Sequence, residues 1–393
     1  MNRGAIIIAV LCVFPGAVLP KDGASKVLEP PSPMARHPIQ TFYDEYEEVE
    51  GIIDRIIEEL SYREMIAELI VTSCGSQGNS FSRVLELIRG GQAGGVMFLG
   101  ATSSEIREYT RTLTEESRKS GLLLPLYAID GEPLLLHERI TDLKGIPGAG
   151  EIRTTEQARE IAFYITAVLR DLGIHINYAP VCDYGFNRAV IGRRSLGTEQ
   201  ESVSALSEIF INTMQANGIV STVKHFPGHG SVEGDSHIEL LFAQGVPLEI
   251  PVFRHAIEVG VVSVMVGHIG VKGAGMYDTE GKPSSLSRAM ITGVLKESLG
   301  FNGIVVSDAL NMRAVVSFDV PGVQALRAGC DMVLMPDDEE AVIDEVRYEI
   351  GFDEEFKHQI VESAKKVVRL KLLLGLINDK ELEKAAQIDD KYR

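Results

Sequence analysis

One short stretch of the chain gathers side chains that can bind a polar substrate or transfer protons. Residues 224–230 read KHFPGHG and are followed by Asp235, Ser236 and His237, so a lysine, three histidines and an aspartate lie close together. The preceding residues 219–223 (IVSTV) are apolar and β-branched, which is typical of a buried strand. A proline and two glycines then end regular structure. The polar side chains therefore lie on a loop at a strand end, which favours a functional site over a merely solvated loop.

The pair Asp235 and His237 suits proton transfer. In an extended segment, residues two apart point to the same side, so the Asp235 carboxylate could contact the His237 imidazole. A neighbouring carboxylate stabilises an imidazolium, raises its pKa and selects its tautomer. Such an imidazole can donate a proton and later take one back. We therefore predict that His237 acts as acid and base and that Asp235 orients it.

A second candidate for catalysis is Asp308. It follows the apolar residues 303–307 (GIVVS), and the two residues after it carry no charge. A carboxylate held rigidly at the end of a buried strand can act as a nucleophile or stabilise a cation. Lys224, His225 and Arg194 would then donate hydrogen bonds to substrate hydroxyls.

A metal site is an alternative interpretation of the same loop. His225, His229, Asp235 and His237 are residue types that bind zinc, as in a metal-dependent hydrolase of barrel fold. Their spacing does not match the H-E-x-x-H pattern of a zinc-binding helix, and a proline and a glycine separate the first two histidines. We therefore predict no metal and no cofactor.

The elements that must position these residues alternate along the chain. Eight short apolar segments are candidate strands, residues 69–73, 95–99, 126–130, 176–183, 220–226, 262–269, 303–308 and 330–335. Amphipathic segments such as residues 155–171 and 201–217 lie between them, as expected for helices. This alternation predicts an α/β protein with a (β/α)8 TIM-type barrel as its single catalytic domain. A doubly wound open sheet is the alternative, but residues 74–78 after the first candidate strand lack a G-x-G-x-x-G phosphate loop.

Polar residues stand where several of these candidate strands end. They are Asp130, Asp183, Lys224, His225, His268 and Asp308. A single carboxylate at such a position is often only the N-cap of the next helix, but five of the eight candidate strands share the pattern. In (β/α)8 barrels the catalytic groups lie at this end of the strands. We therefore expect these side chains to line one site.

Composition limits the classes of partner. With 393 residues, 45% of them hydrophobic, the chain can bury a large core. It carries 38 basic and 56 acidic residues, and the net charge of −18 argues against nucleic acid or an anionic membrane surface as partner. Cys74, Cys182 and Cys330 form neither a disulfide framework nor a C-x-x-C metal site, so each is expected to be a small buried hydrophobic residue. No feature specifies an oligomer, and we expect a monomer.

The N-terminus resembles a secretory signal peptide. Arg3 is followed by the apolar residues 5–14 and by small residues, so residues 1–20 are predicted to direct export to the periplasm or the cell exterior. The alternatives are an uncleaved anchor or a buried N-terminal segment, and for the location a cytoplasmic protein. No other apolar segment approaches the length of a membrane span. Residues 21–50 are rich in proline and acidic residues and predict an extended linker, which leaves residues 51–393 for the barrel domain.

Two motifs carry a resemblance to a known family. Residues 224–230 with Asp235, Ser236 and His237, together with residues 307–312 (SDALNM), resemble the glycoside hydrolase family 3 β-N-acetylhexosaminidases of the single-domain type that recycles peptidoglycan sugars. The likeness covers about residues 55–377 and is supported by residues 177–183, 193–197, 286–288, 299–303 and 328–332. It implies a retaining, exo-acting β-N-acetylglucosaminidase that hydrolyses terminal β-linked GlcNAc. The residues after 335 are expected to form helices rather than a second domain, which suits the type that takes its acid from a barrel loop.

The resemblance also implies a role for each candidate residue. Asp308 would attack the anomeric carbon, and His237, oriented by Asp235, would protonate the leaving oxygen and then activate water. The residues that match family positions holding the sugar ring are Asp130, Arg194, Lys224 and His225. Asp183 is expected to support the mouth of the barrel, and His229 is expected to be structural.

One segment departs from the family pattern. After the acidic residue that ends the third strand the family has Glu-Gly-Gly-Arg, whereas residues 130–139 here read DGEPLLLHER. Asp130 and Glu132 remain, but the glycines and the first arginine are missing. A second family arginine falls at Glu138, with Arg139 one place further on. The change leaves open a reshaped sugar site, a β-glycosidase of different sugar specificity, or a weakened or non-catalytic sugar-binding relative.

Overall fold

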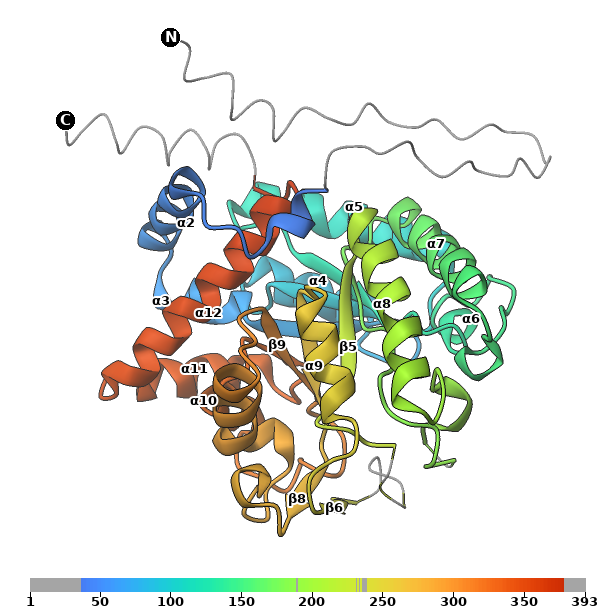
Figure 1. The fold of residues 1–393 in the computed structure, drawn as a ribbon. Coiled ribbons are helices and arrows are strands. Elements are labelled where there is room, and N and C mark those ends of the chain that lie inside the picture. The colour runs from blue at the N-terminus through green and yellow to red at the C-terminus, as the bar shows by residue number, and fades with distance from the viewer. Residues whose placement is uncertain (1–36, 189, 231, 233, 235–238, 378–393) are drawn as a thin grey trace, which may run out of the picture.

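The computed structural model describes residues 37–377 except 189, 231, 233 and 235–238. Eight parallel strands close a barrel in the order β1-β10-β9-β7-β5-β4-β3-β2 (Figure 1). Their bounds are Ile70–Cys74 (β1), Gly95–Phe98 (β2), Leu126–Ile129 (β3), Ile176–Asn177 (β4), Val220–Phe226 (β5), Ser263–Val266 (β7), Ile304–Ala309 (β9) and Met332–Leu334 (β10). Each strand overlaps one of the predicted apolar segments, and the closed barrel confirms the (β/α)8 prediction.

The barrel strands are apolar because both of their faces are covered. β1, β2 and β5 are buried along their whole length, so side chains that face the barrel axis and side chains that face the helices both leave the solvent. Every neighbouring pair in the barrel is parallel. All carboxyl ends therefore meet at one face, and the polar residues that follow the strands are brought together there.

Helices surround the barrel. They are α2 (Glu47–Glu59), α3 (Tyr62–Glu68), α4 (Phe81–Arg89), α5 (Ser103–Ser120), α6 (Leu136–Arg139), α7 (Thr155–Asp171), α8 (Gln200–Ala216), α9 (Ile250–Glu258), α10 (Pro321–Ala328), α11 (Glu339–Glu349) and α12 (Glu354–Leu373). Shorter connections are the 3-10 helices Pro38–Thr41, Ala149–Glu151, Gly192–Arg194, Gly275–Tyr277 and Ser284–Leu286, and the π-helix Ala289–Ser298. Local sequence explains the bounds of α5, because Thr102 and Glu105 form a capping box and Gly121 ends the helix at a φ of 71°.

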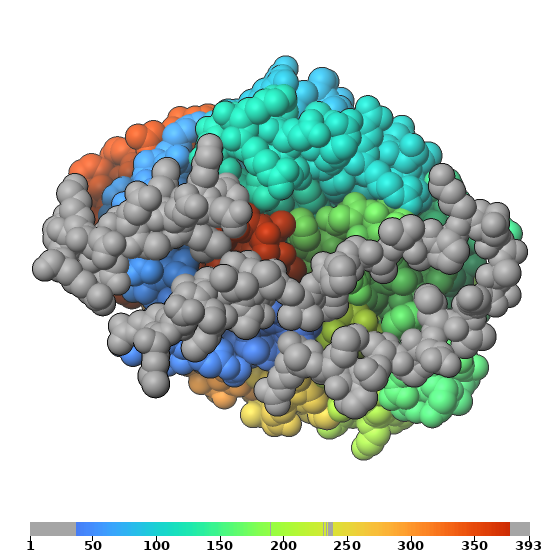
Figure 2. All heavy atoms as spheres, turned by 90° about the horizontal axis from the view of Figure 1, so that it is seen from above, coloured from blue at the N-terminus to red at the C-terminus, as the bar shows by residue number. Residues whose placement is uncertain are grey.

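The first and last described helices lie side by side. α2 packs against α12, and Arg369 of α12 pairs with Glu50 of α2. In the space-filling view of Figure 2 the blue N-terminal part of the chain lies next to the red C-terminal part. None of the described helices is both long enough and apolar enough to cross a bilayer.

The prediction of an extended linker over residues 21–50 is wrong for its described part. Pro38–Thr41 form a 3-10 helix, and α2 begins at Glu47. Ile39 and Phe42 are 0% and 3% exposed and belong to the hydrophobic core, so burial of these two side chains outweighs the linker-like composition. Three of the acidic residues, Glu47, Glu48 and Glu50, fall in the first turn of α2, where the helix dipole favours them. The folded domain therefore begins no later than residue 37, and residues 1–36, with the predicted signal peptide, lie outside the described residues.

A small sheet that the sequence did not predict lies on the same face as the strand ends. β6 (Phe242–Gln244) and β8 (Gly270–Lys272) pair in parallel. β8 follows β7 directly, and β6 belongs to the segment between β5 and α9. In Figure 1 the pair lies at the lower edge of the molecule, on the side of the loop that follows β5.

Candidate active site

A cavity opens at the carboxyl ends of the barrel strands. Its volume is about 1140 Å³, including the part that is open to solvent. Five of the seven predicted site residues line it, namely Asp130, Arg194, Lys224, His225 and Asp308. The cavity is also lined by Gln77, Met97, Leu99, Leu135, Arg139, Tyr178, Val190, His229, Met265, Ala309, Met312, Leu334 and Met335. The other two predicted residues, Asp235 and His237, lie outside the described residues.

Lys224 stands within a buried cluster of charges. Its side chain is 2% exposed, and its Nζ atom bonds Asp130 Oδ1 and, at 2.6 Å, Glu132 Oε1. Arg194 holds Glu132 through two bonds, Nε to Oε2 at 2.8 Å and Nη2 to Oε1 at 2.6 Å. Burial works to raise the pKa of Glu132, but the charges of Arg194 and Lys224 outweigh it and hold that pKa below its ordinary value. Two cations are thus fixed beside the cavity by one ionised carboxylate.

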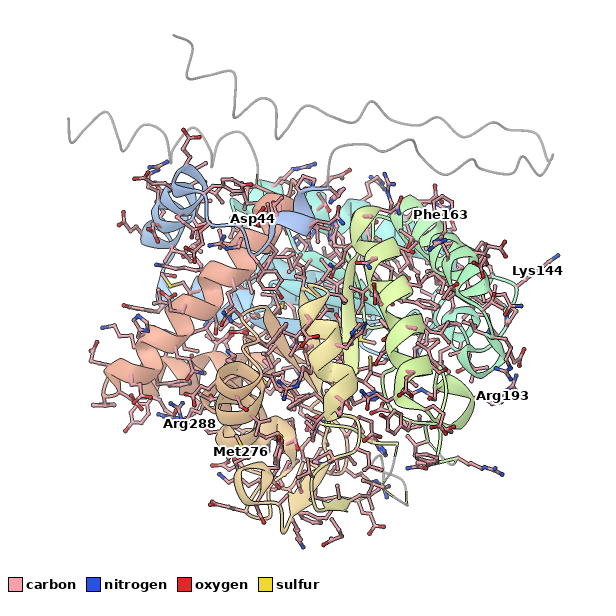
Figure 3. All side chains as sticks on the ribbon, viewed as in Figure 1. Asp44, Lys144, Phe163, Arg193, Met276 and Arg288 are labelled. Atoms are coloured by element: carbon pink, nitrogen blue, oxygen red, sulfur yellow. The ribbon has the colours of Figure 1, made fainter. Side chains whose placement is uncertain are left out.

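Glu132 also determines which of two neighbouring arginines enters the site. Arg193, labelled at the edge of Figure 3, has a side chain that is 70% exposed and pairs with Glu151. The Arg194 side chain is 15% exposed and turns inward to Glu132. The sequence showed that Glu132 remains from the family pattern but did not assign it a partner, because residues 132 and 194 are far apart along the chain.

Asp183 orients two histidines, His225 near the end of β5 and His229 in the loop that follows. Its buried Oδ2 atom lies 2.6 Å from Nδ1 of His225, and its Oδ1 atom accepts a 2.7 Å bond from the backbone N–H of His229. Burial works to raise the pKa of Asp183, but the neighbouring His225 outweighs it and lowers that pKa. The contact at Nδ1 leaves Nε2 as the ring nitrogen of His225 that can meet a substrate. These contacts agree with the supporting role expected of Asp183.

His229, which was expected to be structural, lines the cavity. It is 3% exposed and lines the same cavity as Asp308. Burial lowers the pKa of His229, and the charge of Asp183 offsets part of this effect. Its backbone N–H is tied to Asp183, which fixes where the loop passes the cavity.

Asp308, the predicted nucleophile, has surroundings that keep its carboxyl group ionised. It lies near the end of β9, is partly open to the cavity, and its Oδ1 accepts a 2.8 Å bond from the backbone N–H of Ala309. Burial works to raise the pKa of Asp308, but His268 and His225 outweigh it and hold that pKa below its ordinary value. His268 is itself fixed by Ser285 Oγ at 2.7 Å and by the Ala309 carbonyl at 2.9 Å. Asp308 is therefore ionised at neutral pH and able to attack an electrophilic carbon.

The altered segment after β3 still supplies an arginine to the cavity. Glu138 is exposed, whereas Arg139 turns inward. Arg139 Nη2 lies 3.2 Å from Asp130 Oδ2, and Nη1 donates a 2.9 Å bond to Gln77 Oε1. The short helix α6 ends at Arg139 and brings its side chain back over Asp130. The second family arginine aligns with Glu138, but it is Arg139, one residue further on, that reaches the site.

Several lining residues were missed by the sequence analysis. Four of them are the methionines Met97, Met265, Met312 and Met335, which give the cavity an apolar wall of adaptable side chains. Tyr178 and Gln77 are two further polar ones. Met312 belongs to the motif at residues 307–312 and Tyr178 to the segment 177–183, but neither was assigned a role. Met97, Met265 and Met335 lie within apolar segments, where nothing in the sequence separates a lining residue from a core residue.

The structure confirms the prediction for the cysteines and tests the prediction for metals only in part. Cys74, Cys182 and Cys330 are buried and free, as predicted. In the part of the chain that the structure describes, no group of three histidine, cysteine or acidic residues could hold a metal ion. Two of the four residues considered as zinc ligands, Asp235 and His237, lie outside that part, so the absence of a metal stays a prediction.

Comparisons with known proteins agree with the fold. A β-hexosaminidase of Vibrio cholerae serotype O1 is 32% identical over 269 residues, which cover 66% of this chain and 80% of that protein. The structure of a glycoside hydrolase family 3 β-N-acetylglucosaminidase from Paenibacillus sp. str. FPU-7 has a TM-score of 0.72 at 29% identity, over 84% of this chain and 69% of that one. A β-N-acetylhexosaminidase from Beutenbergia cavernae shares the fold at 23% identity, with a TM-score of 0.71 over 79% of this chain and 98% of that one.

The family match includes every strand of the barrel. Residues 61–370 match the glycosyl hydrolase family 3 N terminal domain, and β1 begins and β10 ends inside this range. The match therefore contains the cavity and all five described site residues. The protein is a glycoside hydrolase and belongs to family 3.

Proposed function

We propose that the enzyme is a retaining, exo-acting β-N-acetylglucosaminidase that removes terminal β-linked GlcNAc, with peptidoglycan fragments as its natural substrates. The observation that carries the proposal is an ionised Asp308 in a cavity whose wall presents Lys224, Arg194 and His225. The names of the Vibrio and Paenibacillus relatives support the choice of sugar. Export directed by residues 1–20 would bring the enzyme to such fragments.

The chemistry proceeds in two steps. In the first, the Asp308 carboxylate attacks the anomeric carbon while His237, oriented by Asp235, gives its proton to the departing oxygen. In the second, His237 takes a proton from water, and the water oxygen displaces Asp308 from the anomeric carbon. Two inversions at one carbon retain its configuration. The histidine does the work for which most retaining glycosidases use a second carboxyl group.

The described residues hold the sugar ring for these steps. Lys224 has three N–H donors and uses two on Asp130 and Glu132, so one is left for a hydroxyl group. Asp130, bonded by Lys224 and Arg139, keeps lone pairs that can accept from another hydroxyl. Nε2 of His225 and the guanidinium of Arg194 complete the set of polar contacts. The buried pairing fixes these groups before substrate arrives, which lowers the entropy cost of binding.

A chromogenic substrate tests the proposal directly. The wild-type enzyme should hydrolyse 4-nitrophenyl β-GlcNAc faster than the matching β-glucoside. Preference for the glucoside would indicate a β-glycosidase of different sugar specificity. Sugar binding without turnover of either substrate would indicate a non-catalytic relative. Treatment with a chelator should leave the rate unchanged, and a loss of activity that zinc restores would favour the metal-dependent alternative.

Removing the proposed acid should affect substrates unequally. His237→Ala should slow hydrolysis of a GlcNAc disaccharide by about 10²- to 10⁴-fold, because its leaving oxygen needs a proton. An activated 2,4-dinitrophenyl glycoside leaves without that proton, so its release in the first step should slow by less than about tenfold. Steady-state and burst kinetics on both substrates measure the difference. Equal losses on the two substrates would remove His237 from the acid role.

A further inference from the structure

A buried carboxyl group lies directly beneath the loop that leaves β5. Glu249 precedes the first residue of α9 and is 0% exposed. Its Oε1 atom accepts a 3.0 Å bond from the backbone N–H of Gly230 and a 3.4 Å contact from that of Tyr184. Its Oε2 atom is buried and has no hydrogen-bond partner among the described residues. The carboxyl group thus joins the loops after β4 and β5 through one oxygen and leaves the other unpaired.

The β5 loop, residues 226–230, is shaped to fit over this carboxyl group. Gly228 has a φ of 134°, and a Cβ atom there would collide with Glu249, lying 2.6 Å from its Cδ atom. A Cβ atom on Gly230 would collide with the backbone of Tyr184, 2.6 Å from its carbonyl carbon. Both glycines are therefore required for the loop to approach so closely. This contact locates His229, which lies between the two glycines and lines the cavity.

The surroundings of Glu249 carry negative charge. Asp183 comes from the loop after β4, is fully buried and is itself bonded by His225 and by the backbone N–H of His229. Tyr184, also from that loop, has its pKa raised by burial and in part by Glu249. On the side of α9, the backbone N–H of Glu249 itself works to lower the pKa of the Glu249 carboxyl group. Burial and the charge of Asp183 raise the pKa of Glu249 to about 7.

We propose that Glu249 is a positioning residue that holds the β5 loop in its working place while the Glu249 carboxyl group is protonated. The neutral group keeps the bonds to Gly230 and Tyr184 without placing a second charge beside Asp183. Ionisation of Glu249 places a second buried carboxylate beside Asp183, and its Oε2 atom has no hydrogen-bond donor among the described residues. The free-energy cost of this buried charge falls only if water reaches the carboxylate, which requires the loop to move. The effect on catalysis rests on the proposed function, because the same loop leads to Asp235 and His237.

The pH dependence of kcat/KM tests the proposal. With 2,4-dinitrophenyl β-GlcNAc, whose departure needs no acid, the wild type should lose about tenfold or more between pH 6 and pH 8.5 as Glu249 ionises. Glu249→Gln keeps the acceptor oxygen and cannot ionise, so its kcat/KM should stay within about threefold over this range. Glu258→Gln, the same change at an exposed position of α9, should keep the wild-type profile. A Glu249→Gln profile that falls with pH like the wild type would overturn the proposal.

Two measurements separate this proposal from the function on which it rests. A wild type that turns over no GlcNAc substrate contradicts the proposed function and leaves the carboxyl group to be examined by infrared titration. Titration should show a protonated carboxyl band with a midpoint near pH 7 that is missing in Glu249→Gln. A midpoint below pH 5 would overturn the positioning proposal whatever the substrate.

The pH dependence of unfolding stability provides a third test of the Glu249 ionisation. The pKa of Glu249 is higher in the folded chain than its ordinary value of 4.5, so the wild type loses stability as pH rises from that value through about 7. The urea midpoint of Glu249→Gln should therefore rise relative to that of the wild type between pH 5 and pH 8. A constant difference between the two midpoints would contradict the ionisation.

Discussion

Asp308→Ala is expected to lower kcat on 4-nitrophenyl β-GlcNAc by on the order of 10⁴-fold, because the attacking oxygen is removed from a two-step reaction. The fold should persist, since Asp308 is partly open to the cavity and its carboxylate accepts a bond from the backbone N–H of the adjacent Ala309. Azide should restore part of the rate by occupying the vacated space, and the product should then be the α-glycosyl azide. Asp319→Ala, an exposed carboxylate on the segment after β9, is the matched control and should retain wild-type kinetics.

A covalent label checks the same residue without mutation. A 5-fluoro GlcNAc derivative with a good leaving group should accumulate as a glycosyl-enzyme, because fluorine slows both steps and the leaving group restores only the first. Peptide mapping should place the label on Asp308. A label on another residue, or an Asp308→Ala variant with near wild-type kcat, would remove Asp308 from the nucleophilic role.

Lys224→Met should cost the protein about 3–5 kcal/mol of unfolding free energy, because it leaves Asp130 and Glu132 buried with one cation fewer. The methionine has similar length, so the loss measures the missing charge more than missing volume. The variant should also lose kcat/KM, since the cation that meets a sugar hydroxyl is gone. Urea unfolding at pH 7 measures the first effect and steady-state kinetics the second.

The control for Lys224→Met is Lys119→Met. Lys119 pairs with Glu116 at the surface, where its side chain is 68% exposed, and its loss should change the unfolding free energy by less than about 1 kcal/mol. The loss of unfolding free energy in Lys224→Met should also become smaller at low pH. The pKa of Glu132 is depressed in the folded chain, so this stabilisation is present above its ordinary value of 4.5 and declines as pH falls below it. Equal losses for the two lysine variants would show that Arg194, with Glu132, and Arg139, with Asp130, satisfy the buried carboxylates without Lys224.

The barrel could be predicted from the sequence because each of its strands is marked by a pattern of neighbouring residues. A strand that is covered on both faces reads as a short apolar run, and β5 shows this from Val220 to Phe226. Parallel strands share one direction, so the residues that end them, such as Asp130, Lys224 and Asp308, had to meet at one face. The candidate cavity therefore followed from the order of apolar and polar residues, and the motifs around it indicated the family.

The pairings inside the site required the folded chain. That Glu132 joins Lys224 to Arg194 and that Glu249 underlies Gly230 are contacts between separate segments of the chain. That Arg139, and not position 138, reaches Asp130 depends on how the single segment after β3 turns back on itself. Residues 37–50 make the same point, because their composition suggests a linker while Ile39 and Phe42 are buried in the core, and the 3-10 helix Pro38–Thr41 contacts α8 and α12. Sequence periodicity reports which face of an element is covered. Which partner covers it, and hence which charges are paired and which carboxyl groups hold a proton, depends on distances that only closure of the barrel sets.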